Sequence, residues 1–231
     1  MKIRTSLSLT TYVSVLLFSL SAWPVFALPS EAMIQRYNQA AQGDEKLVEP
    51  LYADLEKLVA QEGVTALSLV YLGSTRTLMG RDAFLPWKKM RYSEEGLATI
   101  EKGLSLLSSQ VTQSLSSQVT QSSEHTASSE EIRNGLPVQM LAMAVAAATY
   151  TAMPDMFNHF ERGYDLYLNL LSDPQFQAQP FAATAWIYRL AIVAALRVED
   201  EAQARLWLEA MQQADAQHPD TQQAQALLSQ G

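Results

Sequence analysis

The chain contains no cysteine among its 231 residues. This absence excludes disulfide bonds, catalytic thiols and zinc sites built from thiolates, so the fold must rest on packing alone. It also excludes a lipid attached to a cysteine near the N-terminus. Charged residues make up only 17% of the chain, and its 24 acidic residues outnumber its 16 basic ones. Because affinity for nucleic acid comes largely from neutralised phosphates, this balance argues against a DNA or RNA partner.

Motifs for catalysis, for cofactors and for metal ions are lacking as well. The chain has no glycine-rich phosphate loop and no G-x-S-x-G or H-E-x-x-H motif. Its three histidines, His125, His159 and His218, have no metal-ligand spacing between them. The acidic pairs stand at expected helix starts, where carboxylates complement the helix dipole. We therefore expect no catalysis, no cofactor and no metal site.

The first 27 residues have the composition of a cleavable secretory signal. Lys2 and Arg4 precede a mostly apolar segment from Tyr12 to Trp23, and Val25-Phe26-Ala27 then places a small residue on each side of a bulky one. This order is typical of a signal peptide that is cleaved near Ala27. We expect residues 28–231 to form one soluble exported domain, periplasmic in a bacterium with two membranes, and not a lipoprotein.

The rest of the chain predicts helices, because apolar residues recur at helical spacing and almost no segment alternates as a strand does. Capping and breaking residues indicate nine helices that start near residues 30, 44, 64, 86, 136, 156, 180, 200 and 219. Pro50 marks the regular start of the second one. The helix from Leu136 to Met153 is rich in alanine and methionine, so it should be buried on most sides. Its methionines and Met156 are expected to fill the core.

The longest apolar run of the exported part extends from Phe181 to Leu196 and carries Arg189 near its centre. It is 16 residues long, whereas a membrane-spanning helix needs about 20 residues and a mid-bilayer arginine is costly. We therefore expect a buried helix from which Arg189 reaches the surface, and no stable membrane insertion after signal cleavage.

A serine- and glutamine-rich insertion separates the two halves of the chain, at about residues 108–134. The eight residues Leu-Ser-Ser-Gln-Val-Thr-Gln-Ser occur at 107–114 and again at 115–122. Because its apolar content is low, the segment buries too little surface to offset the entropy of ordering it. We expect a loop between two helices that arose by duplication.

Three pairs of consecutive helices share a pattern of large and small residues. The pattern comprises Leu72-Gly73 followed by Gly96, Ile100 and Gly103, Leu141-Ala142 followed by Gly163, Tyr167 and Pro174, and Leu190-Ala191 followed by Ala204, Leu208 and Pro219. Small residues on facing helices allow close approach, and each hairpin then buries its remaining face by stacking on a neighbour.

This pattern resembles the tetratricopeptide repeat (TPR). More narrowly, part of the chain resembles a motif of exported bacterial helical-repeat proteins of unknown function. The residues that carry this resemblance are Tyr71-Leu72-Gly73-Ser74, Arg81-Asp82, Pro86, Lys88, the segment from Tyr92 to Leu97, and Met153-Pro154-Asp155-Met156-Phe157. The resemblance implies an all-α fold of antiparallel helical hairpins, stacked as a short, degenerate TPR-like α-solenoid. It also implies a protein or peptide as the partner, without specifying which, and leaves the number of repeats and the oligomeric state open.

One cluster of basic and aromatic residues is the candidate partner-binding site. Five basic residues lie within 16 positions of an acidic chain, and two aromatic residues accompany them; the cluster is Arg76, Arg81, Trp87, Lys88, Lys89, Arg91 and Tyr92. Arginine and aromatic side chains are enriched at protein interfaces. The alternative is that these side chains serve the fold, their stems covering a loop between two helices while Arg81 pairs with a carboxylate.

Two functions remain open at this point. The first is an exported adaptor or scaffold that binds a protein or peptide in a groove between hairpins, without catalysis. The second is a periplasmic carrier of a small apolar molecule or lipid, with Trp186, Tyr188 and Trp207 lining its pocket.

Overall fold

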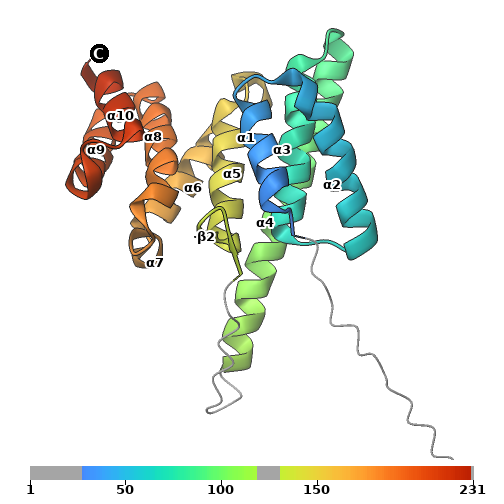
Figure 1. Ribbon diagram of the computed structural model, residues 1–231, viewed down its shortest axis with the longest axis horizontal. Coiled ribbons are helices and arrows are strands. Elements are labelled where there is room, and N and C mark those ends of the chain that lie inside the picture. The colour runs from blue at the N-terminus through green and yellow to red at the C-terminus, as the bar shows by residue number, and fades with distance from the viewer. Residues whose placement is uncertain (1–27, 119–130, 230–231) are drawn as a thin grey trace, which may run out of the picture.

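The protein is mostly helical, and the predicted all-α class is confirmed. The computed structural model describes residues 28–118 and 131–229 (Figure 1). The expected signal segment, His125 and the middle of the insertion lie outside these residues. Within them the elements are, in order, α1 (Glu31–Ala41), the 3-10 helix η1 (Glu45–Leu47), α2 (Val48–Glu62), α3 (Ala66–Asp82), α4 (Pro86–Gln118), β1 (Ile132–Arg133), β2 (Leu136–Pro137), α5 (Val138–Ala152), the 3-10 helix η2 (Asp155–Phe157), α6 (Phe160–Ser172), α7 (Pro174–Gln177), α8 (Phe181–Arg197), α9 (Glu201–Asp215) and α10 (Pro219–Ser229).

Capping residues set several of the helix boundaries. The side chains of Ser30 and Asp200 accept backbone hydrogen bonds at the starts of α1 and α9. Thr65 and Ser68 form a reciprocal capping box at the start of α3. Gly63 follows α2 with φ of +90°, a backbone conformation that glycine adopts without steric cost. Local sequence therefore determines where these helices begin and end.

Several boundaries differ from the sequence prediction. Helix α2 begins at Val48, which places Pro50 within the first turn, where its missing N–H has no intrahelical partner to lose. The short helix α7, capped by Asp173, was not anticipated. Neither was the hairpin of β1 and β2, whose strands are too short to show an alternating pattern.

The prediction of a loop from residue 108 onward is also wrong for the first residues of that segment, because α4 continues to Gln118. Extending an existing helix is easier than starting a new one, so helix can continue beyond its packed region. After the undescribed residues 119–130, the hairpin returns the chain to the start of α1. There the guanidinium of Arg133 donates to the carbonyl of Pro29 at 3.3 Å, and the backbone N–H of Asn134 donates to Glu31 at 2.8 Å.

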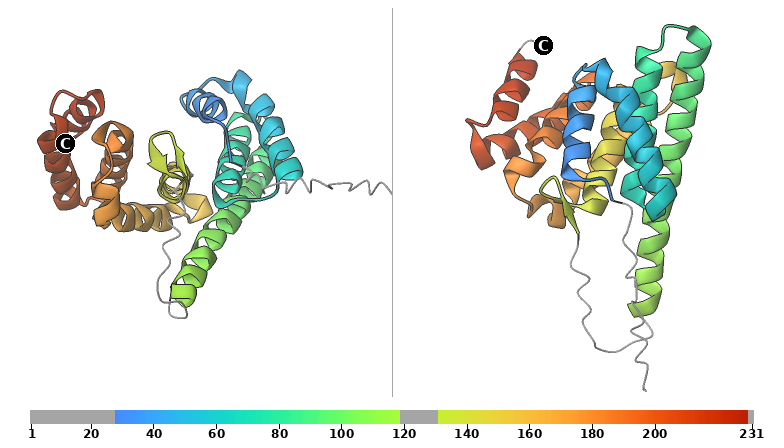
Figure 2. Two further views of the ribbon diagram at one scale, coloured as in Figure 1. Left: turned by 60° about the horizontal axis from the view of Figure 1, so that its bottom comes forward. Right: turned by 45° about the vertical axis from the view of Figure 1, so that its right-hand side comes forward.

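The helices follow an arc. Helices α3 and α4, α5 and α6, and α8 and α9 pack side by side, while α1 and α2 lie against α3. Helix α5 contacts both α3 and α8, so it joins the two ends of the molecule. The left view of Figure 2 shows the curvature, with α2 near one end and α9 and α10 at the other. This curvature leaves a concave face.

Helices α3 and α4 approach each other so closely at Gly73 and Gly96 that neither position has room for a side chain. A Cβ atom placed on Gly73 would lie 2.5 Å from the carbonyl oxygen of Gly96, and one on Gly96 would lie 2.6 Å from that of Gly73. The predicted close approach of these two residues is confirmed. The second predicted contact is shifted: Gly163 approaches Tyr150 and Thr151 at the end of α5 and not Ala142. The short connection between α5 and α6 brings the end of one helix to the start of the next.

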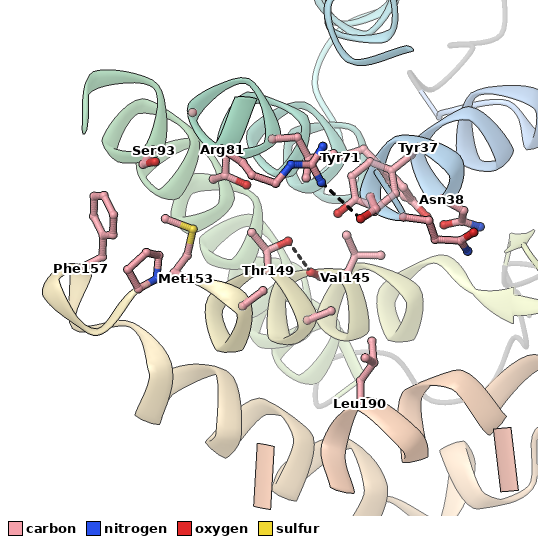
Figure 3. Close-up of a pocket in the computed structure, with 18 of the residues that line it drawn as sticks. Tyr37, Asn38, Tyr71, Arg81, Ser93, Val145, Thr149, Met153, Phe157 and Leu190 are labelled. Carbon is pink, nitrogen blue, oxygen red and sulfur yellow. Dashed lines mark hydrogen bonds between the residues drawn. The ribbon is translucent and has the colours of Figure 1, made fainter. Parts of the chain in front are cut away.

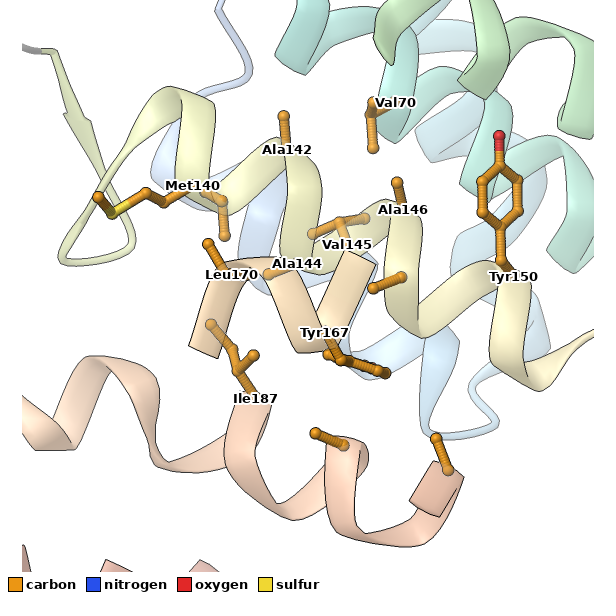
Figure 4. Packing of buried hydrophobic residues seen from close by; sticks show 14 of the residues in the cluster. Val70, Met140, Ala142, Ala144, Val145, Ala146, Tyr150, Tyr167, Leu170 and Ile187 are labelled. Atoms are coloured by element: carbon orange, nitrogen blue, oxygen red, sulfur yellow. The ribbon is translucent and has the colours of Figure 1, made fainter. Parts of the chain in front are cut away.

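Helix α5 lies in the centre of the core, as its composition predicts. Ala142, Ala144 and Ala146 are fully buried between neighbouring helices (Figure 4). Met140 and Met153 are also buried, but Met156 has 71% of its surface exposed, so the prediction that it fills the core is wrong. It lies in η2, outside the packed helix.

Candidate functional site

A groove of about 1150 Å³ runs along the concave face. Its lining comes from α1, α3, α4, α5 and α8, together with the segment after α5 and the tip of the β1–β2 hairpin. Figure 3 shows α5 between the helices of the N-terminal part and Leu190 of α8. Residues from Tyr37 to Leu190 therefore converge on one concave surface.

The floor and walls of the groove are largely apolar. Helix α5 contributes Val145, Ala148 and Ala152, whose small side chains leave room above the helix. Helix α8 contributes Trp186 and Leu190 from the opposite wall. The lining residues of α5 are spaced three or four positions apart, so they lie on one face of this helix, and that face runs along the groove.

A buried polar cluster connects three of these helices. The hydroxyl of Thr149, on α5, donates to the carbonyl of Val145 at 2.9 Å, and its oxygen is hydrogen-bonded to the hydroxyl of Ser74, on α3, at 2.8 Å. Burial raises the pKa of Tyr37, on α1, while hydrogen bonding with Thr149 and Ser74 opposes that rise. The ring of Tyr37 also meets that of Tyr71 edge-on, with centroids 4.9 Å apart. These contacts fix α1 against α3 and α5.

Amide side chains line the groove beside this cluster. Asn38 lies on α1 and Gln42 directly follows that helix, and both are exposed. Neither side chain makes a hydrogen bond to another described residue, so each presents a free donor and a free acceptor. Asn134, at the tip of the hairpin, is a third amide in the lining.

Three cationic side chains line the groove, and the lining contains no carboxylate; they are Arg81, Lys89 and Arg189. Arg81 is held in place by the carbonyls of Ala40 and Ala41 at the end of α1 and by Asp82. Hydrogen bonding to Asp82 raises the pKa of Arg81. Most of the hydrogen-bonding capacity of Arg81 is therefore used inside the protein.

The other two cations are freer. The Lys89 ammonium donates to the carbonyl of Arg81 at 3.0 Å, and no carboxylate lies within ion-pair distance of it among the described residues. Arg189 donates through its Nε to Asp220 at 2.5 Å, at the start of α10. The terminal nitrogens of Arg189 have no hydrogen-bond acceptor in the described part of the chain. Both side chains can bind an anion that enters the groove.

The structure divides the predicted basic and aromatic cluster into separate groups. The guanidinium of Arg76 lies over the rings of Tyr52 and Tyr92, at 4.9 and 4.1 Å, and pairs with Glu95 at 2.5 Å. Arg91 lies 3.7 Å from Glu95. Arg76, Arg91 and Tyr92 are thus engaged with the fold.

The remaining residues of that cluster face in different directions. Arg81 and Lys89 line the groove, as described above. Lys88 lines a second, smaller hollow of about 500 Å³, whose walls also carry Glu45, Glu49 and Asp82. Trp87 borders neither hollow and has 67% of its surface exposed. The seven residues therefore do not form one continuous site.

Three aromatic residues were expected to line a carrier pocket, but they occupy different environments in the structure. Trp186 lines the groove. Tyr188 packs against Phe176 and Phe181, and the ring of Trp207 meets Tyr164 edge-on, so both belong to the core. The expectation of a pocket lined by all three is wrong, because Tyr188 lies on the face of α8 that meets Phe176 of α7, and Trp207 lies on α9, which does not line the groove.

Arg189 and the α1 residues are the part of the groove that sequence reasoning missed. Arg189 was expected to reach the surface, and it does so with 27% of its side chain exposed. Its position within an otherwise apolar helix was the one signal that could have identified it. No comparable signal distinguishes Tyr37 or Asn38, which reach the groove only because α1 packs against α3 and α5.

No described helix is both long and apolar enough to cross a membrane. Over the same residues, no three metal-binding side chains are grouped so as to hold an ion. Comparison of the chain with protein families, with curated proteins and with solved structures finds no match. The geometry of the groove is therefore the basis for a functional proposal.

Proposed function

We propose that this protein is an exported, non-catalytic adaptor with a TPR-like α-solenoid architecture, whose concave groove binds a segment of a partner polypeptide. The observation that carries the proposal is the groove itself, which extends over five helices and has a volume of about 1150 Å³. Pockets for small molecules usually have volumes of about 300–1,000 Å³. Repeat arrays typically bind their partners on such extended concave surfaces.

The chemistry of the lining supports a peptide over a small apolar molecule. A peptide backbone has one donor and one acceptor in each residue, and the amides of Asn38, Gln42 and Asn134 provide the complementary pair. The apolar floor along α5 would accommodate the peptide's side chains. A carrier of lipid or of another small apolar molecule is the second candidate, favoured by the apolar floor and Trp186 but not by these amides.

A selection from a library of random peptides, displayed on phage, tests the proposal. Residues 28–231 serve as the bait, beside two variants that each add one bulky side chain. Ala148→Phe fills the floor of the groove, and the matched control Ala202→Phe changes an exposed position of α9. We expect selected peptides to bind Ala148→Phe about tenfold more weakly, a loss of roughly 1.4 kcal/mol, and to bind the control as they bind the parent.

Failure would take one of two forms. If no peptide is enriched on the parent protein, or if Ala148→Phe binds the selected peptides unchanged, polypeptide binding in the groove is wrong. Native mass spectrometry of protein purified from its host then tests the carrier. A small apolar ligand that is retained by the parent and lost from Ala148→Phe would establish the second candidate in its place.

A further inference from the structure

We infer that the groove selects an acidic segment, with carboxylate side chains on either side of an apolar stretch. This inference rests on the proposed function and specifies its partner. The groove lining holds three cations and no carboxylate, although the chain as a whole carries 24 acidic and 16 basic residues. Asp82 and Asp220 pair with Arg81 and Arg189 from outside the lining. The groove therefore offers an anionic ligand the charge of Lys89 and the two terminal nitrogens of Arg189.

The two cations with spare hydrogen-bonding capacity lie on different walls. Lys89 belongs to α4, on the N-terminal side of the groove, and Arg189 belongs to α8, on the other side of α5. The apolar floor formed by Val145, Ala148 and Ala152 lies on the helix between them. A segment that crosses the groove therefore meets a cation, an apolar floor and a second cation.

Arg189 is positioned for carboxylate recognition. Asp220 fixes the guanidinium through Nε, so the bond orients the side chain and leaves both terminal nitrogens for a ligand. A guanidinium presented in this way can bind a carboxylate with two parallel hydrogen bonds. Lys89 adds a point charge whose flexible stem can follow the ligand. Arg81 contributes positive charge, although Asp82 and the α1 carbonyls already engage its N–H groups.

The same peptide selection tests the inference, with the content of aspartate and glutamate as the first readout. We expect the enriched peptides to be richer in these residues than the starting library. The best peptide is then synthesised beside a counterpart in which each aspartate becomes asparagine and each glutamate becomes glutamine. Fluorescence anisotropy compares the affinities of the two for Lys89→Gln, for Arg189→Gln and for the control Arg205→Gln, which removes an exposed cation of α9.

We expect Lys89→Gln and Arg189→Gln each to weaken binding of the acidic peptide by roughly tenfold, the loss of one charge-assisted hydrogen bond. The control should bind it unchanged, and the amide counterpart should bind all forms equally. Arg189→Gln leaves Asp220 without its partner, so a thermal melt accompanies it. Lys89 pairs with no carboxylate of the described residues, and the same melt shows whether losing its bond to the Arg81 carbonyl affects folding.

The salt dependence of the affinity provides a second readout, because attraction to the groove cations and repulsion from the acidic chain change it in opposite directions. Attraction to the groove cations makes binding of the acidic peptide weaken as salt rises, whereas repulsion from the acidic chain would make it strengthen. Peptides with no acidic enrichment, or affinity that rises with salt, would overturn this inference and leave peptide binding in place. An absence of any enriched peptide would instead overturn the proposed function.

Discussion

Arg76 and Lys88 are both basic residues of one short stretch of sequence, yet they have different roles. Arg76 has 18% of its side chain exposed and contacts two tyrosine rings and Glu95. Lys88 is exposed and makes no ion pair among the described residues. The local sequence does not distinguish the two residues, because it does not reveal which aromatic rings pack against the Arg76 guanidinium in the fold. Tyr52, on α2, is distant in sequence from both.

The first prediction separates these two roles by stability. Arg76→Gln should lower the free energy of unfolding by about 1–2 kcal/mol, because it removes two cation–π contacts and an ion pair. Lys88→Gln, the matched control, should change it by no more than about 0.5 kcal/mol, as is usual for exposed positions. Chemical denaturation monitored by circular dichroism measures both. Equal effects of the two substitutions would mean that the Arg76 contacts contribute nothing specific.

At the scale of the helix, much of the fold could be predicted from the sequence. Caps such as Asp200 and breakers such as Gly63 act on their own neighbours, so the helix ends they determine are encoded locally. The continuation of α4 reflects helix propagation beyond its packed region, the register of α5 against α6 depends on contacts between segments, and the predictions for both were wrong. The groove was predicted only in outline, since its residues converge from helices far apart in the chain.

The contact of α3 with α4 is where a sequence pattern and the packing agree most closely. Glycine costs a helix interior roughly 1 kcal/mol relative to alanine, so replacing Gly73 with alanine would stabilise a free helix. In the folded protein the added methyl group would lie 2.5 Å from a carbonyl oxygen of α4. The helix preference and the packing thus act in opposite directions at this residue.

The second prediction is that packing prevails. Gly73→Ala should lower the free energy of unfolding by about 1–3 kcal/mol, the usual cost of overpacking. Ala98→Leu, an addition of bulk at an exposed position of α4, is the control and should be close to neutral. Denaturant midpoints at unchanged slope measure the difference. A stabilised Gly73→Ala protein would show that α3 and α4 can separate without loss.

For the whole molecule, the proposed binding surface is assembled by curvature and not by any one helix. Helix α5 holds the two ends of the arc and provides the groove floor, so a largely buried helix is also the one that the proposed ligand would meet. Its alanines serve both purposes, because small side chains permit close packing on one face and leave space on the other. A site of this kind leaves little trace in the sequence beyond composition.

The last prediction concerns the N-terminus of the mature protein. The sequence predicts export and cleavage after Ala27, so the mature protein should begin at Leu28. Leu28 packs against the core, the carbonyl of Pro29 accepts from Arg133, and Ser30 caps α1. Each of these contacts would be retained by that cleavage. Cleavage only a few residues later would remove the cap, whose loss typically costs about 1 kcal/mol.

Intact mass of the protein recovered from the exported fraction measures the cleavage position. We expect the mass of residues 28–231, and we expect protein produced without residues 1–27 to melt at the same temperature. As the control, protein that starts at Glu31 should melt earlier, because it lacks Leu28, the Pro29 carbonyl and the Ser30 cap. Recovery of uncleaved chain from the membrane would contradict the prediction, since the first 27 residues would then act as an anchor.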